Sequence, residues 1–141
     1  MSPNLYNSEG YVDPTPYEAL TRIEREAQAV HTFRPVVYIC SPLAGNVAAN
    51  QEAARRYCRF AVDAGYIPIA PHLFFPQFMD ETKASERDLA LFMDTVLLTK
   101  CAELWVFGST ISKGMAIEIA KAQRKDKPIR YFDRNCKEVT R

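Results

Sequence analysis

The stretch that decides the fold is VVYICSPLAGN, residues 36–46. Its first five residues are apolar and mostly β-branched, which is typical of a short strand that is covered on both faces. The next six residues break this pattern, and a helix is predicted from about Val47 to Ala64, where Gly65 ends it. A strand, a turn and a helix in this order form the repeating unit of an α/β fold.

The same alternation continues to residue 132. Short apolar stretches predict three more strands, at 66–70, 103–107 and 128–132, and Pro68 favours a sheet edge for the first of them. Helical periodicity predicts helices at 86–99 and 112–124, and residues 71–85 are expected to form a long loop rich in aromatic side chains. The sequence therefore predicts a three-layer, flavodoxin-like or Rossmann-like α/β fold, with a parallel sheet of about four strands and helices on both faces.

The order of the strands predicts where a ligand binds. Right-handed crossovers favour the order 2-1-3-4, in which the sheet reverses direction between its first and third strands. A ligand is therefore expected between the loop after Cys40 and the turn after Phe107. The helix at 86–99 is expected to contact the core through one apolar face. That face comprises Leu89, Phe92, Met93, Val96 and Leu97.

The first 34 residues are predicted to be separate from this pattern. Residues 1–14 have little periodicity and are expected to form a loose arm. Thr15 can cap a helix, Pro16 suits its first position, and an apolar row continues to Val30. The predicted division is an N-terminal arm and amphipathic helix at 1–34 and a globular domain at 35–141.

Composition excludes several classes of function. The chain has 141 residues, with 18 Lys and Arg against 17 Asp and Glu, so its charge favours neither nucleic-acid polymers nor anionic membranes as partners. Neither a signal peptide nor an apolar stretch of membrane-spanning length is expected. The four cysteines have no metal-binding spacing, which predicts reduced thiols in a cytoplasmic protein without a metal site.

Glu118 is the most informative departure from the expected pattern. Helical spacing places it on one face with Ile111, Met115, Ile119 and Ala122, so a carboxylate lies within an apolar row. An unpaired buried charge costs several kcal/mol unless it is paired, hydrogen-bonded or protonated. One hypothesis is a catalytic carboxylate that faces the ligand site. The alternative is a glutamate at the rim, paired with a nearby basic residue (Lys113, Lys121 or Arg124).

Asp88 is a second candidate, although an acid in the first turn of a helix is more often a cap. If Asp88 reached Glu118, the two could serve as acid and nucleophile at an acetal-like carbon. His72 and the phenylalanines of its loop, Phe74, Phe75 and Phe78, can stack on a base, or else form core or subunit interface.

Three stretches together resemble the nucleoside 2-deoxyribosyltransferase superfamily, including its uncharacterised bacterial and phage-type branches. The stretches are YICSPLAGN at 38–46, ERDL at 86–89 and SKGMAIEI at 112–119, within a resemblance that spans 36–132. The resemblance implies that 35–141 is a domain of this type. It also implies homo-oligomers, and no metal or redox cofactor.

The resemblance further implies a reaction on a (deoxy)nucleoside or nucleotide. Glu118 would attack C1′ and form a glycosyl-enzyme ester, Asp88 would help to protonate the departing base, and Tyr38 would position the nucleophile. The substrate is expected to contact the loop after the first strand, His72, and the start of the helix at 112–124. These residues are Ser41, Pro42, Gly45, Asn46, His72, Ser112, Gly114 and Met115.

Some choices remain open from the sequence. The first loop contains no cation, so a requirement for a 5′-phosphate is undecided, as is the balance between transfer and hydrolysis. An alternative function is a non-catalytic domain that binds a nucleotide-derived ligand and acts as a sensor through the N-terminal helix. A weaker alternative is flavin binding, which this type of sheet permits.

Overall fold

The computed structural model of the protein describes residues 14–30 and 32–141. The chain divides into two compact units between Phe33 and Arg34. The first unit contains helix α1, Pro14–Val30, which confirms the predicted helix and leaves Tyr17 and Ile23 exposed. The predicted arm up to residue 13, and the side chain of Thr15, lie outside the described residues.

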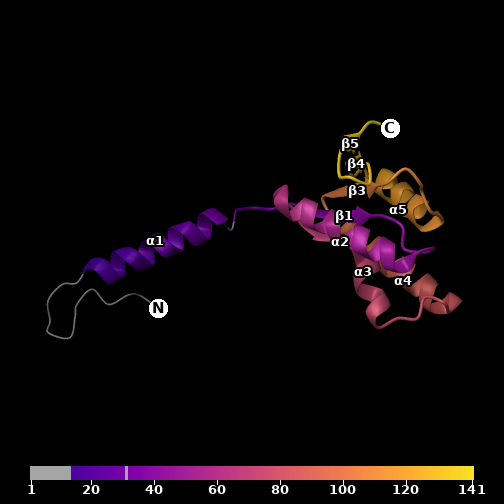
Figure 1. Ribbon diagram of the computed structural model, residues 1–141, viewed down its shortest axis with the longest axis horizontal. Helices are drawn as coiled ribbons and strands as arrows, with labels where there is room; N and C mark the ends of the chain where they lie inside the picture. The colour runs from indigo at the N-terminus through magenta and orange to yellow at the C-terminus, as the bar shows by residue number, and fades with distance from the viewer. Residues whose placement is uncertain (1–13, 31) are drawn as a thin grey trace. The chain divides into compact units, whose positions relative to one another are not determined.

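The second unit is built on one sheet of five strands (Figure 1). The strands are β1 (Val36–Cys40), β2 (Ile67–Ile69), β3 (Glu103–Phe107), β4 (Ile129–Phe132) and β5 (Glu138–Val139). Their order is β2-β1-β3-β4-β5, with the first four parallel and β5 antiparallel to β4. The predicted order of the four parallel strands is confirmed, and so is the edge position of the strand that contains Pro68. The two residues of β5 are too few to produce a recognisable pattern in the sequence.

The helices of this unit connect the parallel strands. They are α2 (Val47–Asp63), α3 (Pro71–Phe74), η1 (Phe75–Gln77), α4 (Ala84–Thr99) and α5 (Lys113–Arg124). The predicted long loop at 71–85 is thus partly helical, because Pro71 and Pro76 each begin a short helical turn. The other three helices agree with their predictions to within two residues at either end.

Alternating side chains of the strands form two cores, one on each face of the sheet. On one face, β1 and β3 contribute Tyr38, Cys40, Leu104 and Val106, which pack with residues of α4 and α5. On the other face, Val37, Ile39, Trp105, Phe107 and Phe132 pack against α2. These two layers of helices around one sheet confirm the predicted three-layer α/β architecture.

The predicted core face of α4 is largely wrong. Leu89, Phe92 and Val96 are 48%, 63% and 42% exposed, whereas Ala90 and Leu98 are buried. The helix is rotated about its axis relative to the prediction, so that the small Ala90 and the large Leu98 face inward. Leu97, also predicted to be core, does pack against the buried cluster. This rotation also turns Asp94, which lies midway between Ala90 and Leu98, toward the interior.

Candidate functional site

The candidate site lies at the carboxyl ends of β1 and β3, where the order of the sheet reverses. Two helices begin beside these strand ends, each with a side-chain cap. Asn46 accepts a hydrogen bond from the Ala49 backbone N–H at 3.2 Å at the start of α2, and Ser112 accepts one from the Met115 N–H at 3.2 Å at the start of α5. Both residues were predicted to contact substrate, and in the structure both act as helix caps.

The loop between β1 and α2 is held in shape by Asn50. The Asn50 side-chain amide donates to the carbonyl oxygens of Leu43 and Ala44, at 3.0 and 2.9 Å. Gly45 has a φ of 96°, a conformation that strongly favours glycine. Pro42 is half-buried at the base of the same loop. A turn that is fixed in this way offers a constant surface beside the strand end.

Glu118 lies on the face of α5 that is directed toward the sheet. Its neighbours at helical spacing, Met115 and Ala122, are buried, and its Oε1 accepts a hydrogen bond from Tyr38 Oη at 3.1 Å. Burial raises the pKa of Glu118 to about 7, while hydrogen bonds from Cys40 and Tyr38 act in the opposite direction. The ion pairs among the described residues are Arg59–Asp63 and Arg130–Glu138, so Glu118 is not the paired rim residue of the alternative hypothesis.

Tyr38 is suited to hold this carboxylate. It is fully buried in β1, and burial, followed by the charge of Glu118, raises the pKa of its phenol well above the ordinary value. The hydroxyl therefore keeps its proton at every physiological pH and remains a hydrogen-bond donor. This contact joins β1 to α5 and brings Tyr38 and Glu118 together beside the switch point.

A second carboxyl group of the site comes from Asp94. Its Oδ1 is buried and has no hydrogen-bond partner within the part of the chain that the structure describes. Burial raises the pKa of Asp94 to about 7, and the charges of Glu118 and Glu81 add to this effect. Asp94 and Glu118 are therefore two partly buried acids, and the charge of Glu118 raises the pKa of Asp94.

Asp88, which the sequence paired with Glu118, lies elsewhere. It is exposed on the first turns of α4, whereas Asp94 is on the side of this helix that faces the interior. The sequence contained a signal for Asp94, since it lies four residues from both Ala90 and Leu98. This spacing does not dominate the apolar pattern of the helix, because the side chains of Leu89, Phe92 and Val96 are larger than that of Ala90.

Ser41 and His72 form a second contact at the same end of the sheet. Ser41 Oγ and His72 Nε2 are 2.8 Å apart, and both side chains are largely shielded from solvent. Burial lowers the pKa of His72 to about 4, so the imidazole is neutral at pH 7. The contact brings two of the predicted substrate-binding residues together, and links β1 to the segment that follows β2.

The other residues predicted near the substrate differ in how far they are exposed. The Met115 side chain is buried in the core, so only its backbone is near the site, where Cys40 Sγ lies 4.0 Å from the Met115 carbonyl oxygen. Gly114 has open space where a side chain would begin. Of the aromatic residues, Phe75 is buried, whereas Phe74 and Phe78 are exposed. The rings of Phe74 and Phe78 contact each other edge to face, with their centroids 5.0 Å apart.

A family model described as "Domain of unknown function (DUF7768)" matches residues 35–132. The chain belongs to this family. The match begins one residue before β1 and ends with β4, so it includes Tyr38, Asp94 and Glu118, while α1 and β5 lie outside it. No match was found among curated proteins.

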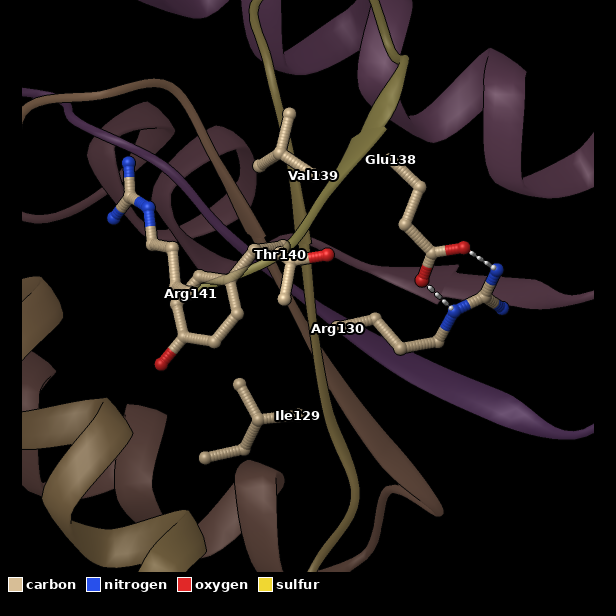
Figure 2. Close-up of a pocket in the computed structure, with 7 residues that line it drawn as sticks. Ile129, Arg130, Glu138, Val139, Thr140 and Arg141 are labelled. Atoms are coloured by element: carbon tan, nitrogen blue, oxygen red, sulfur yellow. Dashed lines mark hydrogen bonds and ion pairs between the residues drawn. The ribbon is translucent and has the colours of Figure 1, made fainter.

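Two open hollows lie away from the candidate site. Arg56, Arg134, Asn135 and Cys136 line one of about 690 Å³. The other, of about 430 Å³, lies along β4 and β5 (Figure 2). In the second hollow the guanidinium of Arg130 donates two hydrogen bonds to the Glu138 carboxylate, at 2.8 and 3.0 Å. Neither hollow contains a residue of the carboxylate pair.

The described residues contain neither a group of three side chains able to hold a metal ion nor a helix long and apolar enough to cross a membrane. The candidate site itself brings together two carboxyl groups, a phenol and a serine–histidine contact.

Proposed function

We propose that this protein cleaves or transfers the N-glycosidic bond of a (deoxy)nucleoside or nucleotide, with Glu118 as the nucleophile. The observation that carries the proposal is that Glu118, which is held by Tyr38, and Asp94, whose Oδ1 is buried without a partner among the described residues, are two inward-facing carboxyl groups beside the switch point of the sheet. Proteins seldom bury two unpaired acids near each other, because the arrangement destabilises the fold. Such pairs are concentrated where catalysis needs one acid ionised and the other protonated.

The surroundings of the two carboxyls assign their roles. Glu118 receives hydrogen bonds that favour its ionised form, whereas Asp94 Oδ1 is buried without a donor among the described residues. With the pKa of both groups raised to about 7, the pair holds close to one proton at neutral pH. Because only Glu118 receives hydrogen bonds from the described residues, we assign that proton to Asp94 and the negative charge to Glu118. The acid role that the sequence hypothesis gave to Asp88 passes to Asp94.

The reaction follows from these roles. Glu118 attacks C1′ from the face opposite the base, the C1′–N bond breaks with its electrons going to the base, and Asp94 supplies the proton that the base takes up. The product is an ester between Glu118 and the sugar. Water or a second base then attacks C1′ and gives Asp94 a proton, while the ester C1′–O bond breaks and Glu118 leaves as a carboxylate. Two displacements at C1′ retain its configuration. No metal or redox cofactor takes part in these steps.

The remaining contacts would bind the sugar. The Ser41 hydroxyl and the neutral His72 ring can exchange hydrogen bonds with hydroxyl groups, and Ser112 is at the start of α5. The resemblance of the sequence further implies a homo-oligomer, and the pattern of its cysteines favours the cytoplasm.

The proposal is tested by incubating the full chain with a panel of deoxynucleosides, deoxynucleotides and free bases and separating the products. We expect release or exchange of the base, and a loss of at least about 1,000-fold in Glu118→Gln. Glu52→Gln, at an exposed position of α2, is the matched control and should retain activity. Intact-mass analysis should show a sugar adduct on the wild type and none on Glu118→Gln. Unchanged turnover in Glu118→Gln would refute its role.

The separate unit formed by α1 favours one second candidate, a non-catalytic domain that binds a nucleotide-derived ligand. The same panel distinguishes the two. A sensor would bind a ligand saturably without breaking a bond, and would change its assembly or the exposure of α1 on binding.

A further inference from the structure

Cys40 is the last residue of β1, and its side chain is fully buried. It follows Tyr38 by two residues, so the two side chains share one face of the strand, and both belong to the core that includes Met115 of α5. The Cys40 Sγ lies 4.0 Å from the Met115 carbonyl oxygen, about one helical turn before Glu118. The thiol therefore lies against the part of α5 that carries the proposed nucleophile.

This thiol has two hydrogen-bond acceptors within reach. The Met115 carbonyl is the weaker one, because it is neutral and the contact of 4.0 Å is long. The other is the Glu118 carboxylate, and the hydrogen bond between it and Cys40 favours the ionised form of the acid. A hydrogen bond to an ionised acceptor is about twice as strong as one to a neutral acceptor. The carboxylate is therefore the preferred partner whenever Glu118 is ionised.

The Cys40 thiol acts as a donor and not as a thiolate. Burial, followed by the charge of Glu118, raises its pKa well above the ordinary value, so the thiol keeps its proton at neutral pH. Many buried cysteines serve only as small apolar side chains. Cys101 fits that description, since it belongs to the same core at the other end of the sheet and its thiol donates to the Leu97 carbonyl oxygen at 3.4 Å. Cys40 differs because one of its acceptors can ionise.

We propose that Cys40 is a positioning residue whose thiol donates to Glu118 when that carboxyl is ionised, and to the Met115 carbonyl when it is protonated or esterified. Together with Tyr38, it gives the carboxylate two donors from one face of β1, which fix its orientation before it attacks. When the ester forms, the thiol returns to the Met115 carbonyl and is not left without an acceptor. The ester step rests on the proposed function, whereas the exchange of acceptors depends only on the ionisation of Glu118.

The titratable groups around this thiol come from several elements. Tyr38 shares its strand and keeps its proton, while Glu118 faces it from α5. Asp94 of α4 interacts with both Tyr38 and Glu118, and Glu81, which precedes α4, acts on Asp94. The pKa values of Glu118 and Asp94 are both raised to about 7, so a test must separate these two acids.

Infrared spectroscopy of the S–H stretch tests the exchange of acceptors on the full chain without a substrate. The band of Cys40 is identified by its loss in Cys40→Ala. We expect this band to move to lower frequency as the pH rises through about 7, because a stronger hydrogen bond weakens the S–H bond. The movement should persist in Asp94→Asn and be lost in Glu118→Gln. The band of Cys101, identified by its loss in Cys101→Ala, is the matched control and should not move.

A second measurement separates positioning from packing. Cys40→Ala removes the donor, so Glu118 should bind its proton about three-fold more tightly, as measured by carbon-13 NMR of labelled glutamate. Cys40→Ser keeps a donor at this position and should restore the wild-type titration. Cys101→Ala removes a buried thiol from the same core and should leave the titration unchanged. Circular dichroism verifies that each variant is folded.

Three results would overturn the proposal. The Cys40 band could stay constant in the wild type between about pH 5 and about pH 9, a range that includes the ionisation of Glu118. The band could still move in folded Glu118→Gln. Folded Cys40→Ala could titrate as the wild type does. Neither measurement depends on turnover, so a failure here is distinguishable from an absence of glycosidic activity.

Discussion

The Tyr38 hydroxyl donates a hydrogen bond to Glu118 Oε1 at 3.1 Å, across 80 residues of sequence. The donor is on the central strand β1 and the acceptor on α5, so the contact depends on the strand order that brings β1 beside β3. It provides a buried carboxylate with a partner that cannot lose its proton, because burial raises the pKa of the phenol far above the physiological range. This contact gives the clearest way to examine the site by mutation.

Tyr38→Phe removes this hydrogen bond and keeps the ring in the core. Since the bond lowers the pKa of Glu118, its loss should move that pKa upward from about 7. We expect kcat/KM to fall about 10- to 100-fold, and the acidic limb of the pH–rate profile to shift to higher pH. Carbon-13 NMR of labelled glutamate measures the pKa directly, even without a known substrate. Tyr57→Phe, a buried tyrosine on the opposite face of the sheet, is the control that should leave both values unchanged.

Asp94→Asn should change how stability depends on pH. The folded state holds the proton of Asp94 up to about pH 7, whereas the unfolded chain loses it near the ordinary value of 3.8. The folded state therefore binds more protons between these values, and this contribution to stability declines as the pH rises, then levels off. The free energy of unfolding of Asp94→Asn, relative to that of the wild type, should therefore increase by about 2 kcal/mol from pH 4 to pH 8. This is roughly half the full linkage value, because the site is partly open to solvent.

Urea denaturation at each pH measures this difference in the free energy of unfolding. Glu52→Gln, at an exposed position of α2, is the control, and it should change the free energy of unfolding by less than about 0.5 kcal/mol at each pH. A flat difference for Asp94→Asn as well would mean that Asp94 is ionised in the folded protein and is not the acid of the pair.

His72→Gln should reveal a pH dependence of the opposite sign. Burial lowers the pKa of His72 to about 4 from an ordinary value of 6.5, so the unfolded state binds the extra proton first as the pH falls. The stability that His72 contributes is complete above pH 6.5 and declines as the pH falls toward 4. We expect the wild type to lose about 2 kcal/mol relative to His72→Gln over this range.

Ser41→Ala separates the hydrogen bond from the titration. The substitution removes the partner of His72 Nε2 but keeps the ring buried. It should therefore lower the free energy of unfolding by about 1 kcal/mol at every pH. If His72→Gln behaved in this pH-independent way too, then His72 would be solvated and charged in the folded state at low pH.

Much of the fold could be predicted from the sequence because its signals are local. The strands at β1 and β3 are short and apolar, their helices are amphipathic, and crossover handedness then fixes their order. The switch point follows from that order, whereas the role of Tyr38 beside Glu118 was implied only by the family resemblance. The rotation of α4 could not be predicted in the same way, because it depends on which side chains fit against α5 and the sheet. Ala90 and Leu98 fit there, and this tertiary choice placed Asp94 inside and Asp88 outside.

This rotation can be tested with one matched pair of substitutions on α4. Leu98→Ala removes a fully buried side chain and should cost about 2 to 5 kcal/mol of unfolding free energy, because it leaves a cavity. Leu89→Ala makes the same chemical change at a position that is 48% exposed and should cost less than about 1 kcal/mol. Both are measured by urea denaturation at the same low protein concentration. A larger cost at Leu89 than at Leu98 would instead support the sequence-based orientation, with Asp88 closer to Glu118.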